Sequence, residues 1–311
     1  MSTAQWSNYW SEGNLTSLPQ GFSGNYDDDI KQFWWHQFDR LENTARILDV
    51  CSGNGAIALL AAEYAKEKNR DFSIIATDAA KLDKAQIAKM RPEVADALAL
   101  ITFIDRTPLE QLALDEQSID LVTSQYGIEY TDWERSAEQV ARWLKPGGFL
   151  AIISHARDTV IIDSMKSEQK EYRIIEPSGF FTRARKVLKH NPSQRELQGL
   201  LEPVGYELQR TLITRVSPLL KPLMNTVQFV FNASPERFAE QKAEVMSYLN
   251  GLIDAMHRLR DLLSVHERFD ASPNWFQTFE RDGISLIHEE KLIYRGSISA
   301  GNSYIYQKSA S

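Results

Sequence analysis

The sequence predicts an α/β protein with a doubly wound, Rossmann-like sheet, and three observations carry this prediction. Between residues 46 and 154, short apolar runs alternate with longer helical ones, which is the pattern of repeated β-α units. A glycine turn, Gly53-Asn54-Gly55, follows the first apolar run. The chain has 311 residues, of which 43% are hydrophobic and 25% charged, so a globular core is expected.

The strands of this region are indicated by short runs rich in β-branched residues. They are expected at residues 46–51, 73–78, 99–104, 119–125 and 149–155. Helices are expected in the longer runs between them, at residues 56–68, 80–90 and 132–144. The Lys-Pro-Gly-Gly segment at 145–148 predicts a turn before the fifth strand.

After residue 156 the pattern becomes mostly helical. Ser193 and Glu196 form a capping box for a helix that is expected to stop at Pro203. A long amphipathic helix is expected from Ser234 and Pro235. Its apolar stripe consists of Phe238, Val245, Leu249, Leu252, Met256, Leu259 and Leu263. We interpret the stripe as packing on its own domain, and a homodimer seam is the alternative.

The two ends of the chain complete the predicted organisation. The C-terminal runs 284–296 and 302–308 are expected to form an antiparallel strand pair at the sheet edge. The predicted division begins with an aromatic lid segment at residues 1–45, followed by the α/β core at 46–156. A helical insertion at 157–268 is expected to serve as a substrate cap or dimer element, and the C-terminal strands at 269–311 are expected to complete the sheet.

Composition excludes several classes of protein. A net charge of -7 argues against nucleic acid as the main partner, because phosphate neutralisation needs clustered Lys and Arg. The single cysteine, Cys51, cannot form an internal disulfide and fits a reducing cytoplasm. No signal peptide and no membrane-spanning run is visible. No His, Cys and carboxylate cluster at metal-ligand spacing stands out either.

The glycine turn between strand and helix is typical of a nucleotide site, because glycines allow close backbone approach at the carboxyl edge of a parallel sheet. Asp78, at the end of the second strand, is placed to accept hydrogen bonds from ribose hydroxyls. Gly53 to Ala58 also satisfies the loose dinucleotide pattern G-x-G-x-x-A. Asp49 just before the turn favours the amino group of a methionine moiety over a pyrophosphate.

The motifs together resemble the class I S-adenosylmethionine-dependent methyltransferases, in the style of the ubiquinone/menaquinone-type branch. The resemblance rests on "ILDVCSGNG", "IIATDAA", "TPLEQLALDEQSIDLVTSQYGIEY" and "LKPGGFLAI". It covers residues 46–155 well and the C-terminal strands loosely, and it implies a seven-stranded sheet and S-adenosylmethionine as cofactor. Cys51 stands where many members have glycine, and "DRTPLEQL" lacks the common "GDA".

Carried over to this chain, the resemblance implies a set of cofactor-binding residues. Asp49 and the turn from Cys51 through Gly53, Asn54 and Gly55 would hold the methionine part, and Asp78 the ribose. The adenine would lie along Thr107, Pro108 and Leu109, and the methyl-donor side would face Ser124 and Gln125. We interpret Cys51 itself as a small buried side chain rather than a nucleophile.

Acceptor residues are expected beyond the carboxyl ends of the fourth and fifth strands. The candidates for catalysis are Tyr126, Glu129 and His155, with His155 preferred because imidazole titrates near neutral pH. A structural histidine is the alternative. The candidates for a lid over the substrate are Trp6, Tyr9, Trp10, Tyr26 and Arg157, where aromatic rings suit a planar or cationic substrate. A tail packed on the sheet edge is the alternative.

These features predict transfer of a methyl group from S-adenosylmethionine to a small-molecule acceptor, with the acceptor atom (O, N, S or C) left open. A NAD(P)-dependent oxidoreductase and a non-catalytic S-adenosylmethionine-binding module are the two alternatives. The helical insertion is expected to set substrate choice, because in this fold the chemistry is shared and specificity lies in added elements.

Overall fold

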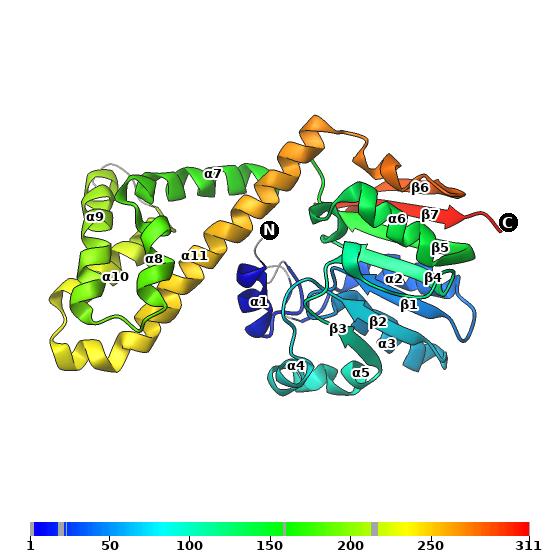
Figure 1. Cartoon of the computed structure of the whole chain (residues 1–311), viewed down its shortest axis with the longest axis horizontal. Coiled ribbons are helices and arrows are strands. Elements are labelled where there is room, and N and C mark those ends of the chain that lie inside the picture. Colours follow the sequence, from blue (N-terminus) through cyan, green and yellow to red (C-terminus); the bar gives the residue numbers. More distant parts are fainter. Residues whose placement is uncertain (1–2, 18–21, 23, 158–159, 213–216, 311) are drawn as a thin grey trace. The chain divides into compact units, whose positions relative to one another are not determined.

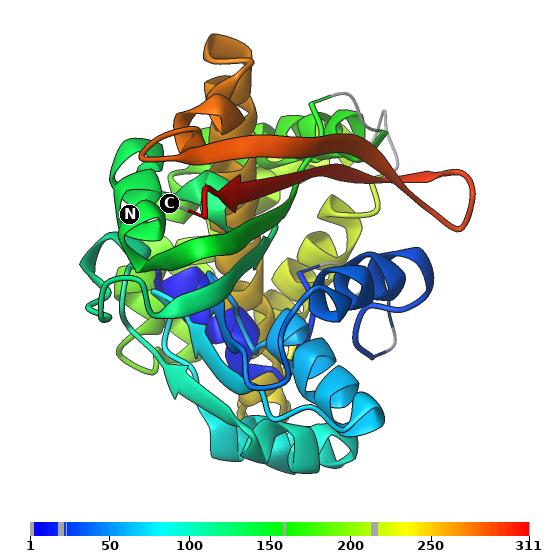
Figure 2. The same cartoon turned by 90° about the vertical axis from the view of Figure 1, so that its right-hand side faces the viewer.

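A single mixed sheet organises the α/β part of the chain (Figures 1 and 2). The computed structural model describes residues 3–17, 22, 24–157, 160–212 and 217–310. Within them the strand order is β3-β2-β1-β4-β5-β7-β6. The strands are β1 Arg46–Val50, β2 Ser73–Thr77, β3 Ile101–Ile104, β4 Ile119–Gln125, β5 Leu144–Ser154, β6 Ile284–Tyr294 and β7 Ile298–Lys308.

The first five strands pair in parallel, and β7 runs antiparallel to both of its neighbours, β5 and β6. The predicted α/β fold with a seven-stranded sheet is therefore confirmed, including the antiparallel C-terminal pair (orange and red in Figure 2). The α-helices are α1 Ala4–Ser11, α2 Asp28–Asp39, α3 Ala56–Lys68, α4 Lys84–Met90, α5 Ala95–Ala99, α6 Trp133–Trp143, α7 Val160–Ile175, α8 Phe180–Leu188, α9 Gln194–Leu212, α10 Leu220–Asn232 and α11 Pro235–Ala271.

The strands supply two hydrophobic cores because successive side chains point to opposite faces of a sheet. Ile47 belongs to one core and its neighbour Leu48 to the other, and Ile74 and Ile75 divide in the same way. One core takes in the apolar face of α2 and most of α3, and the other takes in α6 and the last turns of α11. This double burial explains why the strands read as continuous apolar runs.

The chain divides into two compact units by its internal contacts. One unit contains residues 1–159 and 265–311 and therefore the whole sheet, and the other contains residues 160–264. The second unit, called the helical unit below, has a hydrophobic core of its own, which includes all seven residues of the apolar stripe of α11. The stripe thus packs within the unit.

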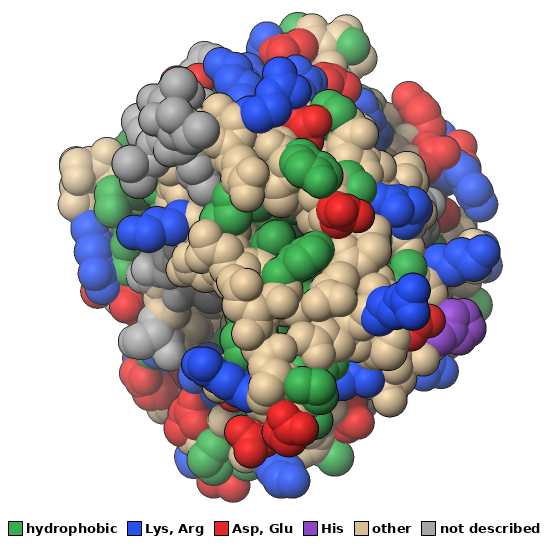
Figure 3. Space-filling view, turned by 90° about the vertical axis from the view of Figure 1, so that its left-hand side faces the viewer, with side chains coloured by type: hydrophobic (Ala, Val, Ile, Leu, Met, Phe, Trp, Pro, Cys, Tyr) green, Lys and Arg blue, Asp and Glu red, His purple; other side chains and the backbone are tan. Residues whose placement is uncertain are grey.

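The alternative of a homodimer through the helical unit stays a prediction. Tyr206 and Phe231 are its exposed large hydrophobic residues among those that the structure describes. Figure 3 shows the side of this unit, where hydrophobic side chains lie between Lys, Arg, Asp and Glu side chains.

Two local predictions were wrong. The capping box at Ser193 is present, with the Glu196 carboxylate accepting from the Ser193 N–H at 2.7 Å, but α9 continues through Pro203. Leu200, Leu201, Val204 and Leu208 are buried on both sides of the proline, so burial of this face outweighs the cost of about 3 kcal/mol that proline imposes on a helix.

The Lys-Pro-Gly-Gly segment is the second difference, because it lies inside β5 rather than in a turn before it. The register between β4 and β5 shifts between Ile119 and Leu121, so the strand is irregular there. A side chain at Gly148 would lie 2.9 Å from the Lys145 carbonyl oxygen. The glycine thus permits the close backbone approach that the irregular pairing requires.

No helix in the described part of the chain is long and apolar enough to cross a membrane.

Candidate cofactor and acceptor site

The turn between β1 and α3 needs glycine for two reasons. Gly53 and Gly55 have φ angles of 53° and 81°, in the left-handed region that glycine adopts without cost. A side chain at Gly53 would also lie 2.4 Å from the indole of Trp10. The turn is fixed by the Ser52 N–H, which donates to the Thr77 carbonyl oxygen at 3.0 Å. The turn therefore presents bare backbone at the carboxyl edge of the sheet.

Asp78 ties the end of β2 to this turn. Its carboxylate accepts hydrogen bonds from the Gly53 N–H at 2.8 Å and from the Ala80 N–H at 2.7 Å, one on each oxygen. Burial raises the pKa of Asp78, while the two N–H donors oppose the shift. Each carboxylate oxygen can accept a further hydrogen bond, so the geometry suits a group that offers two adjacent hydroxyls.

Asp49 is almost fully buried and acts as a brace between three elements. One oxygen accepts from the Thr123 hydroxyl of β4 at 3.0 Å, and the other accepts from the Ala58 N–H of α3 at 3.2 Å. Burial raises the pKa of Asp49 to about 7. Both bonds lie within the protein, and the expected contact with a methionine amino group stays a prediction.

The other residues predicted for the cofactor also lie near the carboxyl ends of the strands. The Thr107 N–H donates to the Asp78 carbonyl oxygen at 2.9 Å, which places Thr107 and Pro108 near Asp78, whereas Leu109 is buried in a core. The Ser124 hydroxyl bonds the Val50 carbonyl at 3.1 Å. The Gln125 side chain accepts from the Trp34 indole at 2.6 Å.

The three predicted catalytic residues come together after β4 and β5. The ring of Tyr126 stacks on the imidazole of His155 with centroids 4.7 Å apart. The His155 N–H donates to the Glu129 carboxylate at 3.0 Å. The Tyr130 hydroxyl lies 3.3 Å from His155 Nε2. Sequence order alone placed these residues on two strand ends, and the parallel pairing of β4 with β5 makes them neighbours.

Burial changes the order of preference among these groups. It raises the pKa of the Glu129 carboxyl to about 7, and, with His266 nearby, it lowers the pKa of His155 to about 3. His155 is therefore neutral at physiological pH and a weak base, whereas the Glu129 carboxyl group titrates close to physiological pH. Burial and neighbouring carboxylates also raise the pKa of the Cys51 thiol, which favours the interpretation of Cys51 as an unreactive side chain.

The predicted lid residues of the N-terminus form helix α1, which lies over the glycine turn. The Asn54 side chain donates to the carbonyl oxygens of Trp10 and Asn14, both at 2.8 Å. Tyr9 and Trp10 pack with Ala80 and Leu82, which follow β2. At the other end Trp6 meets the ring of Tyr130 edge-on at 6.0 Å. The helix thus spans from the end of β2 to the turn after β4.

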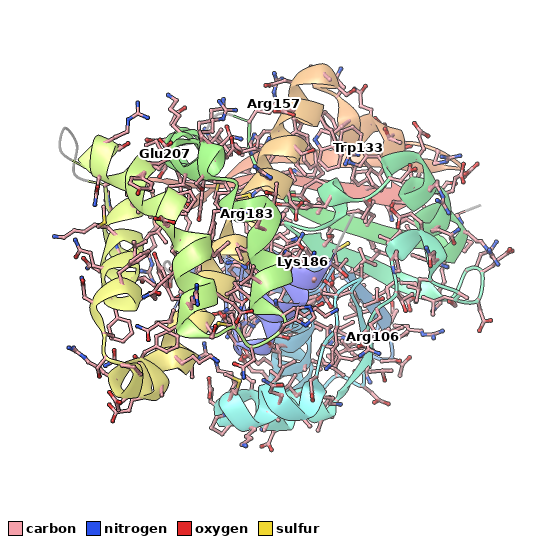
Figure 4. The ribbon with its side chains drawn as sticks, turned by 60° about the vertical axis from the view of Figure 1, so that its left-hand side comes forward. Arg106, Trp133, Arg157, Arg183, Lys186 and Glu207 are labelled. Atoms are coloured by element: carbon pink, nitrogen blue, oxygen red, sulfur yellow. The ribbon has the colours of Figure 1, made fainter. Side chains whose placement is uncertain are left out.

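The two other lid candidates have different surroundings. Tyr26 is buried, and its ring meets the ring of Tyr126 edge-on at 6.3 Å. Tyr26 therefore packs against one of the predicted catalytic residues. Arg157, labelled in Figure 4, follows β5 and pairs with Asp270 at 3.1 Å.

Arg268, from the last turns of α11, is a site residue that sequence reasoning missed. Its guanidinium donates to the carbonyl oxygens of Glu129 and Thr131 at 3.2 and 2.9 Å. It also lies 3.8 Å from the ring centre of Trp133, at the start of α6 (Figure 4). No local motif marks it, because more than 130 residues separate it from its partners. Only the fold brings them together.

Comparisons with known proteins agree with this arrangement. Residues 47–148 match the sequence model of a family described as "Methyltransferase domain". The ubiquinone/menaquinone biosynthesis C-methyltransferase UbiE of Edwardsiella ictaluri is 20% identical over 216 residues, which cover 63% of this chain and 83% of that protein.

Two solved structures are also similar. The YcgJ protein of Bacillus subtilis is 21% identical with a TM-score of 0.35, and the match covers 46% of this chain and 58% of that one. A methyltransferase of Mesorhizobium loti is 24% identical with a TM-score of 0.30, over 40% and 52% of the two chains. The chain thus spans less than two thirds of these solved proteins.

The strand order, the glycine turn with Asp78 and the family match over residues 47–148 support a class I S-adenosylmethionine-dependent methyltransferase. S-adenosylmethionine is its cofactor.

The residues present fit this cofactor. Buried polar atoms without a hydrogen-bond partner in the described residues gather at the strand ends, among them Asn54 Oδ1 and Thr77 Oγ1. The described residues show no group of three or more His, Cys, Asp or Glu side chains that could hold a metal ion. The expectation of a metal-free site stays a prediction.

Proposed function

We propose that this chain transfers the methyl group of S-adenosylmethionine to a small-molecule acceptor whose reacting atom lies beside Tyr126, Glu129 and His155. The observations that carry the proposal are the stacking of the Tyr126 and His155 rings and the hydrogen bond from the His155 backbone N–H to the Glu129 carboxylate, next to the glycine turn. The net charge of -7 supports a small molecule over a nucleic acid. The curated relative is named for ubiquinone/menaquinone biosynthesis, which also supports a small molecule.

The proposed roles follow from the geometry. The cofactor supplies an electrophilic methyl group on a sulfonium. Asp78 holds the ribose, and the backbone of the glycine turn supports the methionine part. Where the acceptor arrives protonated, Glu129 takes its proton, because its pKa of about 7 suits a base at neutral pH. Neutral His155 orients the acceptor by a hydrogen bond, and the rings of Tyr126 and Tyr130 exclude water.

Helix α1 serves as the proposed lid of this site. Its aromatic face covers the glycine turn through Trp10 and reaches the acceptor side through Trp6. The proposed substrate is therefore enclosed partly by rings, which suits a planar or cationic molecule.

The test labels the products directly. Purified protein and S-adenosylmethionine carrying a labelled methyl group are added to a cell extract, which is then separated by ultrafiltration. We expect label in the low-molecular-weight filtrate, and a large loss of it with Asp78→Ala. Label only in protein or nucleic acid would contradict a small-molecule acceptor. Absence of label with cofactor binding intact would favour a non-catalytic module.

A further inference from the structure

Three carboxylates, of which Asp49 and Glu129 are buried and Asp78 is partly buried, lie at the carboxyl ends of β1, β2 and β4, and they differ in their partners. Asp49 and Asp78 each have both oxygens hydrogen-bonded within the protein. Glu129 is 0% exposed, and its second oxygen, Oε2, has no hydrogen-bond partner in the described residues. A buried carboxylate oxygen without a partner is costly, so this oxygen is available to a ligand.

The backbone around Glu129 favours its charged form. The His155 N–H donates to Oε1, and the N–H groups of Gly127 and Glu129 also lower the pKa of this carboxyl group. Burial opposes them and raises that pKa to about 7. At neutral pH the carboxyl group is therefore divided between its protonated form and its carboxylate form, and a nearby positive charge would favour the carboxylate.

The turn that carries Glu129 lies against the end of β1, because a side chain at Gly127 would lie 2.4 Å from Cys51 Cβ. Burial raises the pKa of Cys51 and of Tyr126, and the charge of Glu129 adds to both shifts. Described cations do not neutralise it: His155 is neutral, and the guanidinium of Arg268 bonds backbone carbonyls instead. The titratable and charged groups that interact with Glu129 are Cys51, Tyr126, His155, Arg268 and Tyr304. Tyr130 and His266 lie against His155, and Asp78, Glu110 and Asp49 act on Cys51.

We propose that Glu129 is the counter-ion of the sulfonium in this site and makes the protein prefer S-adenosylmethionine over its demethylated product, S-adenosylhomocysteine. The two molecules differ by the methyl group and by one positive charge at sulfur, so a nearby carboxylate discriminates between them. The proposal rests on the cofactor and not on the class of acceptor. Its test needs no acceptor and can fail independently of the proposed function.

The Glu129 carboxylate also accounts for the loss of both charges of the site during methyl transfer. As the bond from the acceptor atom to the methyl carbon forms and the carbon–sulfur bond breaks, the sulfonium becomes a neutral thioether. A proton leaving the acceptor then neutralises Glu129. The counter-ion and its cation therefore disappear together, which favours release of the product.

The experiment is calorimetric titration of the ligand-free protein with S-adenosylmethionine and, separately, S-adenosylhomocysteine at pH 6 and pH 8. In the wild type we expect the ratio of the two affinities to rise about 10-fold or more in favour of S-adenosylmethionine at pH 8. Glu129→Gln keeps the size of the side chain and should lose this rise, with S-adenosylhomocysteine binding largely retained. Glu116→Gln is the control, because it removes the same charge from an exposed residue before β4.

Two results would overturn the proposal. One is a wild-type affinity ratio that does not change with pH. The other is a ratio that still rises in Glu129→Gln, which would assign the titration to Asp49, whose pKa is also about 7. If Glu129→Gln binds neither molecule, Glu129→Ala replaces it, since alanine leaves space instead of a buried amide.

Discussion

At the scale of single residues, Asp78 connects the stability of the glycine turn to cofactor affinity. Its carboxylate accepts the Gly53 and Ala80 N–H groups and retains capacity for ribose hydroxyls. We expect Asp78→Ala to weaken S-adenosylmethionine binding by about 1.5–3 kcal/mol, the range for hydrogen bonds to a charged group. Isothermal titration calorimetry measures the change.

The control for Asp78 is Asp83→Ala in the same connection between β2 and α4. Asp83 caps α4 by accepting the Gln86 N–H at 3.0 Å, so its loss should lower the melting temperature with little effect on affinity. Equal affinities of the Asp78 variant and the wild type, in a folded protein, would show that Asp78 braces the turn without touching the cofactor.

Cys51 and Gly127 form a second pair at this scale. Cys51 has a φ of 54°, in the left-handed region that glycine adopts without cost. A side chain at Gly127 would lie 2.4 Å from Cys51 Cβ. We expect Gly127→Ala to reduce the free energy of unfolding by about 1–3 kcal/mol through overpacking.

The double variant separates this contact from a general effect of alanine. In Cys51→Gly/Gly127→Ala the clash with Cβ is gone, so part of the lost stability should return in a double-mutant cycle measured by urea unfolding. Strict additivity of the two single changes would mean that the crowding at Gly127 has another source.

At the scale of elements, helix α1 and the glycine turn depend on each other. Trp10 covers Gly53, and the Asn54 side chain holds the Trp10 carbonyl. If α1 is a lid, Trp10→Ala should speed dissociation of S-adenosylmethionine about 10-fold or more in stopped-flow fluorescence, because the cover over the turn is lost. Trp35→Ala provides the matched loss of a tryptophan, because the Trp35 ring packs against Tyr64 of α3 rather than against the glycine turn. An unchanged dissociation rate would support the alternative of a tail packed on the sheet edge.

The last turns of α11 hold the turn that carries Glu129. Arg268 donates to the carbonyls of Glu129 and Thr131 and stacks on Trp133. Arg268→Lys keeps the charge but loses the two-pronged geometry, so we expect faster hydrogen exchange over residues 126–132 by mass spectrometry. Arg260→Lys, whose partner Glu176 is exposed, should leave this segment unchanged. Unaltered exchange in Arg268→Lys would mean that the other hydrogen bonds of the turn, from Ser124, Thr131, Trp133 and His155, are sufficient to hold it.

These elements also show what the sequence could predict. The repeating β-α pattern was sufficient for the five parallel strands and for α3, because burial on both faces leaves a strong apolar signal. The site residues on strand ends followed from that order. The contacts of Arg268 and of Asp49 could not be predicted from the strand order, because both residues bond to distant segments of the chain. Burial, which sequence does not show, also reversed the preference between His155 and Glu129 as a base.

At the scale of the whole molecule, the two units have separate hydrophobic cores, so we expect two transitions in differential scanning calorimetry. Saturating S-adenosylmethionine should raise only the transition of the sheet-containing unit, because a ligand stabilises the unit that binds it. The transition of the helical unit then serves as an internal control. A single transition that shifts as a whole would show that the units unfold together.

The pH dependence should follow the same division. Asp49 and Glu129, both in the sheet-containing unit, have pKa values raised to about 7, whereas unfolded carboxyl groups titrate near pH 4. Between about pH 4 and pH 7 the folded unit therefore binds more protons than the unfolded chain, and its stability falls as pH rises. His155, whose pKa is lowered to about 3, opposes this trend only below its unfolded pKa near 6.5. In the ligand-free protein the transition of this unit should therefore move to lower temperature from pH 6.5 to pH 8. Glu129→Gln should reduce the movement, and an equal movement in that variant would leave Asp49 as its source.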